Sequence, residues 1–171
     1  MSPARKPPFD PYAILTALER HAVRYVLIGA FARVIEGTDE ITHGVDLAPS
    51  LRAENLRRLA LALDEVEARH PDGQPLQLGY DLARGPVLAL HTKGGELKLV
   101  PEPEGTRGGY DDLRRHAIRE PLGRGLRPQV ASISDLARMA AALARQQDLE
   151  PLRQLRILAE YERGRYRGIE R

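Results

Sequence analysis

Short apolar runs separated by glycine and proline dominate the first third of the chain. Residues 25–28 (YVLI) are β-branched and aromatic, and the run stops at Gly29, which predicts a short buried strand. Residues 30–36 carry apolar side chains at helical spacing, and residues 45–48 (VDLA) predict a second strand that ends at a proline. This second run contains Asp46, and a carboxylate within an otherwise apolar strand calls for a structural or functional explanation.

The rest of the chain alternates between helical and extended patterns. Helical spacing predicts a helix from Pro11 to about Arg20, one capped by Ser50 that ends near His70, a short one at 110–118, one from Ser132 or Ser134, and one from Asp148. Extended patterns predict strands at 76–82, 87–92 and 96–100 and an edge strand at 123–130. This order of elements predicts an α/β (α+β) domain in which helices pack on a mixed sheet.

Length and composition restrict the class of protein. A chain of 171 residues suits one domain with its own core; we expect a loosely ordered arm at 1–10, a domain at 11–163 and a basic tail at 164–171. The chain has no cysteine and no stretch of the roughly 20 apolar residues that a membrane span needs. We therefore expect a cytoplasmic protein without a membrane partner.

Arginine is concentrated near the C-terminus. The formal net charge is only +2 at pH 7, so bulk attraction to nucleic acid is weak. Six arginines nevertheless fall within residues 153–171. Two interpretations stay open, a solvated basic tail and a weak contact with nucleic acid.

The strand, glycine corner, helix and second strand together resemble a known layout. Residues 29–32 (GAFA) are similar to the glycine corner, and residues 42–47 (THGVDL) to the metal-binding strand, of the DNA polymerase β-like nucleotidyltransferase superfamily. Residues 95–100 (GELKLV) resemble its third catalytic strand, and residues 132–149 resemble its closing helices. The resemblance covers most of residues 22–155 and points to small prokaryotic members that stand alone or accompany toxin and antitoxin partners. It implies a mixed sheet closed by C-terminal helices.

The catalytic residues that this resemblance implies are only partly present. Members of the superfamily usually hold two divalent ions with three carboxylates, because hard cations prefer oxygen ligands. This chain has Gly44, Asp46 and Lys98 at the three positions, so one carboxylate of three remains. Glu40 stands where an arginine is expected, and Ala140 stands near the position of a basic residue. These differences imply a degenerate metal site with little affinity for metal or triphosphate.

We therefore predict a catalytically degenerate protein that acts as a binding or regulatory module. The resemblance implies that a nucleotide or another anionic ligand would contact Gly29, Ala30, Thr42 and Lys98. No cofactor is expected in this case. The fold could equally present a surface to a protein partner, as in toxin and antitoxin pairs, or to a second copy of the chain.

An active nucleotidyltransferase with a rebuilt metal site is the alternative. In this hypothesis Asp46, with Glu40 or Glu96, holds a single Mg²⁺ or Mn²⁺ ion. The enzyme would then transfer a nucleoside monophosphate to a hydroxyl group of a protein, an RNA or a small molecule. The survival of Asp46 among nearby carboxylates motivates this hypothesis.

A purely structural interpretation of the same residues is also open. Glu96 and Lys98 lie two apart on one strand face, so they could form an ion-pair lattice with Asp46. Arg145 and Asp148 match the Arg-x-x-Asp-Leu of the family's closing helices. We interpret them as a structural pair that orients two helices.

Overall fold

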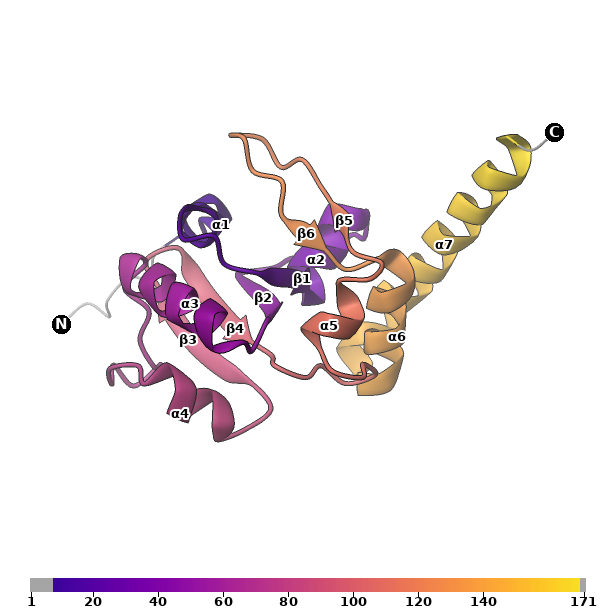
Figure 1. Cartoon of the computed structure of the whole chain (residues 1–171). Helices are drawn as coiled ribbons and strands as arrows, with labels where there is room; N and C mark the ends of the chain where they lie inside the picture. The colour runs from indigo at the N-terminus through magenta and orange to yellow at the C-terminus, as the bar shows by residue number, and fades with distance from the viewer. Residues whose placement is uncertain (1–7, 170–171) are drawn as a thin grey trace.

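A six-stranded mixed sheet lies at the centre of the computed structural model, which describes residues 8–169 (Figure 1). The strands are β1 (Tyr25–Ile28), β2 (Gly44–Pro49), β3 (Leu88–Thr92), β4 (Gly95–Leu99), β5 (Ile118–Arg119) and β6 (Gln129–Val130). Their order across the sheet is β3–β4–β2–β1–β6–β5. Strand β2 runs antiparallel to β1 and parallel to β4, and β1 runs parallel to β6. The predicted mixed sheet is therefore confirmed.

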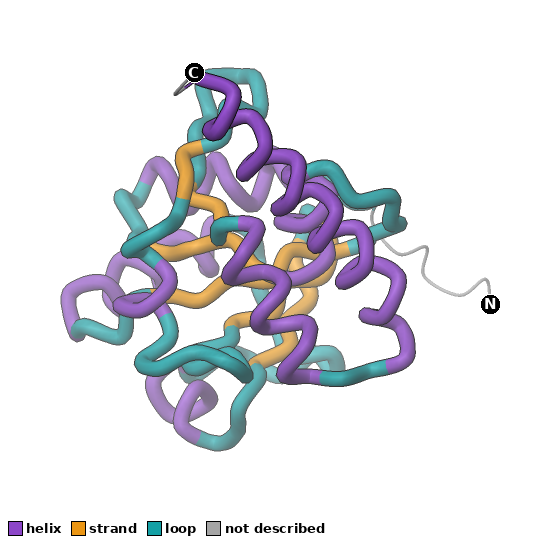
Figure 2. Tube along the Cα trace, turned by 90° about the vertical axis from the view of Figure 1, so that its right-hand side faces the viewer, coloured by secondary structure: helices purple, strands orange, loops and turns teal. Residues whose placement is uncertain are grey.

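Helices pack on this sheet in two groups. They are α1 (Pro11–Arg20), α2 (Gly29–Glu36), α3 (Ala53–Glu65), α4 (Leu78–Ala83), α5 (Tyr110–Leu113), α6 (Ile133–Leu143) and α7 (Leu149–Ile169), with a 3-10 turn, η1 (Gln146–Asp148), before the last. Helix α1 contacts α3, whereas α6 contacts both α2 and α7. Figure 2 shows α7 running diagonally across one side of the molecule. The C-terminal helices thus close the domain, and no helix of residues 8–169 is long and apolar enough to cross a membrane.

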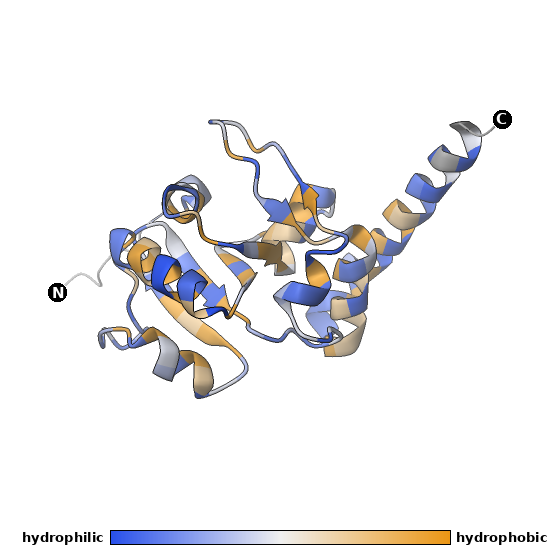
Figure 3. Cartoon of the chain, viewed as in Figure 1, coloured by the Kyte–Doolittle hydropathy of each residue, from blue (hydrophilic) through white to orange (hydrophobic). Residues whose placement is uncertain are grey.

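Strand β1 is central: it pairs with a strand on each side, and its side chains are buried on both faces of the sheet. All four of its residues are buried. Leu27 pairs with Leu47 of β2 on one side and with Val130 of β6 on the other, and all three are fully buried. Each such side chain contributes roughly 1.5–3 kcal/mol when it leaves water. Figure 3 shows hydrophobic residues along the strands, whereas hydrophilic residues are prominent on α3.

The strand predicted at residues 76–82 is wrong, because this segment forms helix α4. The carboxylate of Asp81 accepts a hydrogen bond from the backbone N–H of Gln77 at 2.7 Å and lies 2.8 Å from Nε2 of His70. Side-chain bonds to nearby backbone groups compete with sheet pairing. Here the contacts of Asp81 stabilise the short helix α4. Because this segment is not a strand, β3 forms only one isolated β-bridge on its outer edge, between Arg69 and His91.

The start of helix α3 also differs from the prediction. The residue at its N-cap is Arg52, not Ser50, and no side chain caps it. Ser50 is buried, and its carbonyl oxygen accepts a hydrogen bond from Nδ2 of Asn55 at 2.8 Å. Oδ1 of Asn55 in turn accepts a hydrogen bond from the backbone N–H of Arg24 at 2.7 Å. Asn55 therefore ties the helix to the end of β2 and the start of β1.

Two predicted elements are shorter than expected. The helix expected at 110–118 is α5, which ends at Leu113. Of the edge strand expected at 123–130, only Gln129 and Val130 form a strand, which is β6. Gly123, Arg124 and Gly125 have φ values of +85°, +52° and +76°, which no strand accommodates. These residues instead form the tip of the hairpin between β5 and β6, and β5 is the edge strand.

The two ends of the described chain are more ordered than the sequence predicted. The Phe9 ring packs edge-on against an aromatic ring of α2 with a centroid distance of 5.8 Å, and Asp10 caps α1. Helix α7 continues through residues 164–169, so this part of the expected tail is helical. The remaining parts of the expected arm and tail, 1–7 and 170–171, lie outside the described residues.

Glu36, the last residue of α2, has an unfavourable environment for a charged carboxyl group. Partial burial, and then the carboxylates of Glu120 and Glu162, raise the pKa of Glu36 from 4.5 to about 7. The folded state therefore binds more protons between these pH values, so this contribution to stability is present below pH 4.5 and is lost as the pH rises through about 7.

We expect Glu36→Gln to raise the free energy of unfolding by about 1 kcal/mol at pH 8 and to leave it nearly unchanged at about pH 4, the figure being reduced for solvent screening. Urea denaturation at the two pH values measures this difference. Glu160→Gln, at an exposed position of α7, is the matched control and should change stability equally little at both. An equal gain for Glu36→Gln at both pH values would contradict the assignment.

Candidate functional site

Asp46 lies on β2 where β1 turns into α2. Its partner on β1 is Ile28, and α2 begins at the next residue, Gly29. Gly29 has φ +71°, and a Cβ atom there would lie 2.5 Å from Oδ2 of Asp46. Glycine is thus required twice, by the backbone conformation and by the carboxylate that occupies the corner. Burial in this corner raises the pKa of Asp46.

Gly44, at the first carboxylate position, also has no space for a side chain. A Cβ atom at Gly44 would lie 2.7 Å from the backbone oxygen of Glu96 and 2.9 Å from its Cβ. The hydroxyl of Thr42 donates a hydrogen bond to the carbonyl oxygen of Gly44 at 2.9 Å. A carboxylate could return to this position only if β4 moved away from β2.

Lys98, at the third carboxylate position, lies directly beside Asp46. The two residues are register partners on the parallel strands β2 and β4. The Lys98 ammonium, and then the Arg33 and Arg145 guanidinium groups, oppose the larger effect of burial on the pKa of Asp46. Asp46 forms no ion pair with Lys98 or with any other residue of 8–169, so the ion-pair lattice expected for Glu96, Lys98 and Asp46 does not include the Asp46 carboxylate. Arg33 and Arg145 form ion pairs nearby.

A buried ion network forms the helical wall of the site. Arg33 of α2 donates to both carboxylate oxygens of Glu40, at 2.9 and 2.8 Å, and lies 3.5 Å from Oδ1 of Asp148. Arg145 donates to Asp148 at 2.6 and 3.1 Å. Arg33 and Asp148 are only 6% and 1% exposed. The structural pair predicted for Arg145 and Asp148 is confirmed, and it joins the turn before α7 to α2.

The role expected for Glu40 changes in this setting. In the sequence, Glu40 stands where the resemblance leads us to expect an arginine. Although burial opposes the effect, hydrogen bonds from Arg33 and Thr38 lower the pKa of Glu40, which therefore stays ionised. Glu40 thus neutralises the Arg33 guanidinium. Nothing in the sequence pattern indicated this pairing, although an arginine within the apolar helix 30–36 was a signal that a carboxylate must accompany it.

Two cavities meet over this corner. One has a volume of about 170 Å³ and is partly apolar, with Met139 and Ala140 of α6 in its wall. The other has a volume of about 520 Å³ and opens toward Ala30 and Thr42. Both are lined by Gly29, Arg33, Asp46, Lys98 and Arg145. We call their union the cleft. The sequence assigned seven residues to an anion or metal site, and all of them line this cleft: Gly29, Ala30, Glu40, Thr42, Asp46, Glu96 and Lys98. Their roles stay predictions.

Comparison with known proteins identifies the fold. No protein-family model matches the chain, and no curated protein sequence matches it. Solved structures do match: the antibiotic-resistance factor ANT(2'')-Ia has a TM-score of 0.57 at 15% identity, covering 94% of this chain and 92% of that one. The lincosamide antibiotic adenylyltransferase LnuA, solved with lincomycin bound, has a TM-score of 0.59 at 14% identity, covering 86% and 95%. TM1012 from Thermotoga maritima, assigned as a nucleotidyltransferase, has a TM-score of 0.53 at 17% identity, covering 82% and 86%.

This chain has the nucleotidyltransferase fold. The resemblance read from the glycine corner and the strand of Asp46 is confirmed at the level of the fold. Within residues 8–169, no group of three or more histidine, cysteine, aspartate or glutamate side chains is placed to hold a metal ion.

Proposed function

We propose that this chain is a catalytically degenerate nucleotidyltransferase-fold protein that acts as a binding or regulatory module. The observation that carries the proposal is the contact at Gly44, where the backbone of Glu96 occupies the place of a side chain. A chance substitution of one ligand would leave that space open. Here the strands have closed over it, and Lys98 occupies the third position.

The charges of the cleft disfavour a nucleoside triphosphate as its ligand. Its larger cavity is lined by six carboxylates and three cationic side chains. Two of the three cations, Arg33 and Arg145, are held by carboxylates of the network, which leaves only Lys98 to attract an anion. A nucleoside triphosphate without metal would meet net repulsion there. We therefore infer that the partner is a protein, as the resemblance to toxin- and antitoxin-associated members suggests, rather than a free nucleoside triphosphate.

A thermal-shift titration tests the proposal, because ligands that bind only the folded state raise its melting temperature. We expect wild-type protein to show no shift with MnCl₂, MgCl₂ or Mg·ATP. Lys98→Asp should gain a Mn²⁺-dependent shift of about 3 °C, since two carboxylates would then face each other across β2 and β4.

Lys93→Asp is the matched control, because Lys93 is exposed in the turn between β3 and β4 and lines neither cavity of the cleft. It should gain no response to Mn²⁺. Stabilisation of the wild type by Mg·ATP that disappears in Asp46→Ala would overturn the proposal in favour of the active alternative. Transfer of labelled AMP to protein, RNA or a small molecule, lost in the same variant, would overturn it equally.

A further inference from the structure

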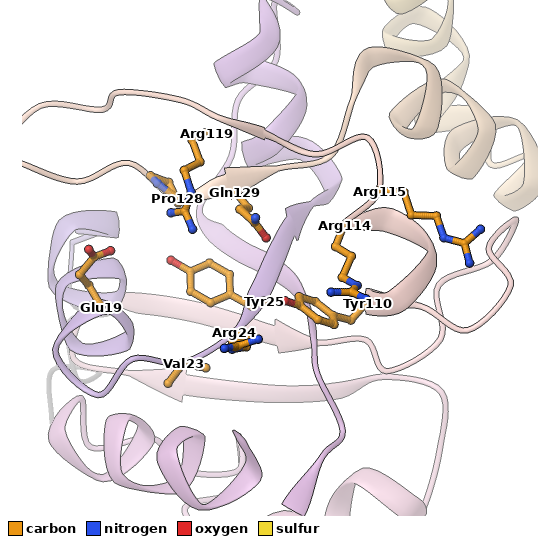
Figure 4. Close-up of a pocket in the computed structure, with 10 residues that line it drawn as sticks. All are labelled: Glu19, Val23, Arg24, Tyr25, Tyr110, Arg114, Arg115, Arg119, Pro128 and Gln129. Atoms are coloured by element: carbon orange, nitrogen blue, oxygen red, sulfur yellow. The ribbon is translucent and has the colours of Figure 1, made fainter. Parts of the chain in front are cut away.

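Another cavity, separate from the two that form the cleft, has a volume of about 540 Å³ and lies at the opposite end of β1 (Figure 4). Tyr25, the first residue of β1, lies in its wall, whereas Ile28, the last residue of β1, lies in the wall of the cleft. The two ends are about 10 Å apart at the rise of a β-strand. No residue lines both this cavity and the cleft. We call it the arginine pocket, defined by Arg24, Arg114, Arg115, Arg119, Tyr25 and Tyr110.

The arginine pocket has a strong excess of positive charge. Four arginines and one carboxylate, Glu19, line it, although the Arg115 side chain extends away from the others in Figure 4. Arg114 lies 3.6 Å from Asp111, but both side chains are at least half exposed, so this pair is weak. Arg119 donates only to a backbone carbonyl, at 3.2 Å. Among residues 8–169, no carboxylate forms an ion pair with Arg24. The pocket therefore holds more cations than its own carboxylates neutralise.

The arginines come from parts of the chain that are distant in sequence. Arg24 precedes β1, Arg114 and Arg115 follow α5, and Arg119 ends β5. Only the pairing of β5 with β6 and of β6 with β1 brings them around one cavity. Like charges repel one another, and a fold has no reason of its own to gather four guanidinium groups. A bound anion would remove that repulsion.

Tyr25 adds a neutral donor to the arginines. The residue is only 7% exposed, and Figure 4 shows its hydroxyl directed into the pocket, with Arg119 extending toward it. Burial, and then the nearby Glu19 carboxylate, raise the pKa of Tyr25, so the hydroxyl keeps its proton at neutral pH. Guanidinium and hydroxyl groups together suit phosphate oxygens, which accept hydrogen bonds and donate none.

Positive charge continues from the arginine pocket along the β5–β6 hairpin. Residues 114–127 contain five arginines and one acidic residue, Glu120. Arg124, at the tip, lies over the ring of Tyr12 at 4.1 Å, and the hairpin projects from the sheet in Figure 1. A small anion would use only the pocket. Arg124 and Arg127, which lie outside the pocket, add cations that match a ligand with more than one phosphate.

We propose that the arginine pocket binds a phosphate of a nucleic-acid strand whose neighbouring phosphates contact the β5–β6 hairpin. This surface differs from the C-terminal arginines, for which the sequence left a solvated tail and a weak nucleic-acid contact open. The arginines of α7 lie on a separate helix, and Arg153 is already paired with Glu150. The inference does not depend on the function proposed for the cleft, because the two sites share no residue.

Fluorescence anisotropy with a labelled single-stranded 12-mer, as RNA (U₁₂) and as DNA (dT₁₂), tests the proposal on the full chain. We expect binding of both at 50 mM salt. Four phosphate contacts should weaken binding about 50-fold between 50 and 200 mM salt, given a slope of about −0.7 per phosphate for single strands. Arg119→Glu and Arg24→Glu should each weaken binding at least about tenfold and flatten that slope.

Arg156→Glu, an equal charge change at an exposed position of α7, is the matched control and should change affinity less than about twofold. Arg24 is exposed in a loop, so Arg24→Glu keeps the test valid if Arg119→Glu disturbs β5. Three results would overturn the proposal: binding that does not depend on salt, greater loss in Arg156→Glu than in the pocket variants, and equal binding of a polyglutamate peptide of the same length. Binding of AMP or inorganic phosphate without binding of either 12-mer would also overturn it.

Discussion

Asp148→Ala is expected to lower the free energy of unfolding by about 3–5 kcal/mol, because it leaves a buried guanidinium with too few partners. Asp148 is 1% exposed and contacts both Arg33 and Arg145. Arg33, itself buried, would keep only Glu40. The loss should appear as a lower midpoint of urea denaturation with an unchanged m-value.

Two further variants make this expectation specific. Glu150→Ala removes an exposed carboxylate just after η1, whose partner Arg153 is also exposed, and should cost less than about 0.5 kcal/mol. Arg145→Ala removes the half-exposed partner of Asp148 and should cost an intermediate amount, about 1–2 kcal/mol. If Asp148→Ala cost no more than Glu150→Ala, the network would not hold α7 against α2.

Gly29→Ala is expected to cost about 2–3 kcal/mol, from a left-handed backbone conformation and from contact with Asp46. The two causes can be separated with Gly73→Ala. Gly73 has φ +85°, but a Cβ atom there would meet nothing within 4 Å, so this variant should cost only the backbone part, about 1 kcal/mol.

A double-mutant cycle then tests the contact itself. Asp46→Ala alone should leave stability unchanged or raise it, because burial raises the pKa of this carboxyl group. Combined with Gly29→Ala, it should recover about 1 kcal/mol of the loss. Additive effects of the two substitutions, measured by urea denaturation, would show that Asp46 does not occupy the glycine corner.

The local pattern of the chain was sufficient for the centre of the fold and for the position of the candidate site. The strands at β1, β2 and β4 follow from apolar runs that end at glycine or proline, and these signals are local. The glycine corner and Asp46 lie within 18 residues of each other, so the sequence could place them together. Local reasoning was less successful where side chains redirect the backbone. Asp81 turns an apolar segment into helix α4, which periodicity alone could not reveal.

Contacts between distant residues required the tertiary structure. Arg33 and Asp148 are 115 positions apart, so no pattern could show that Glu40 and Asp148 share one guanidinium. The closure of β4 over Gly44 depends on the register of two strands that are not consecutive in the chain. The arginine pocket likewise exists only because β6 inserts between β1 and β5. Local hydrophobic patterning sets the elements, whereas the neighbours of a charged group depend on how those elements pack, and packing is a property of the whole chain.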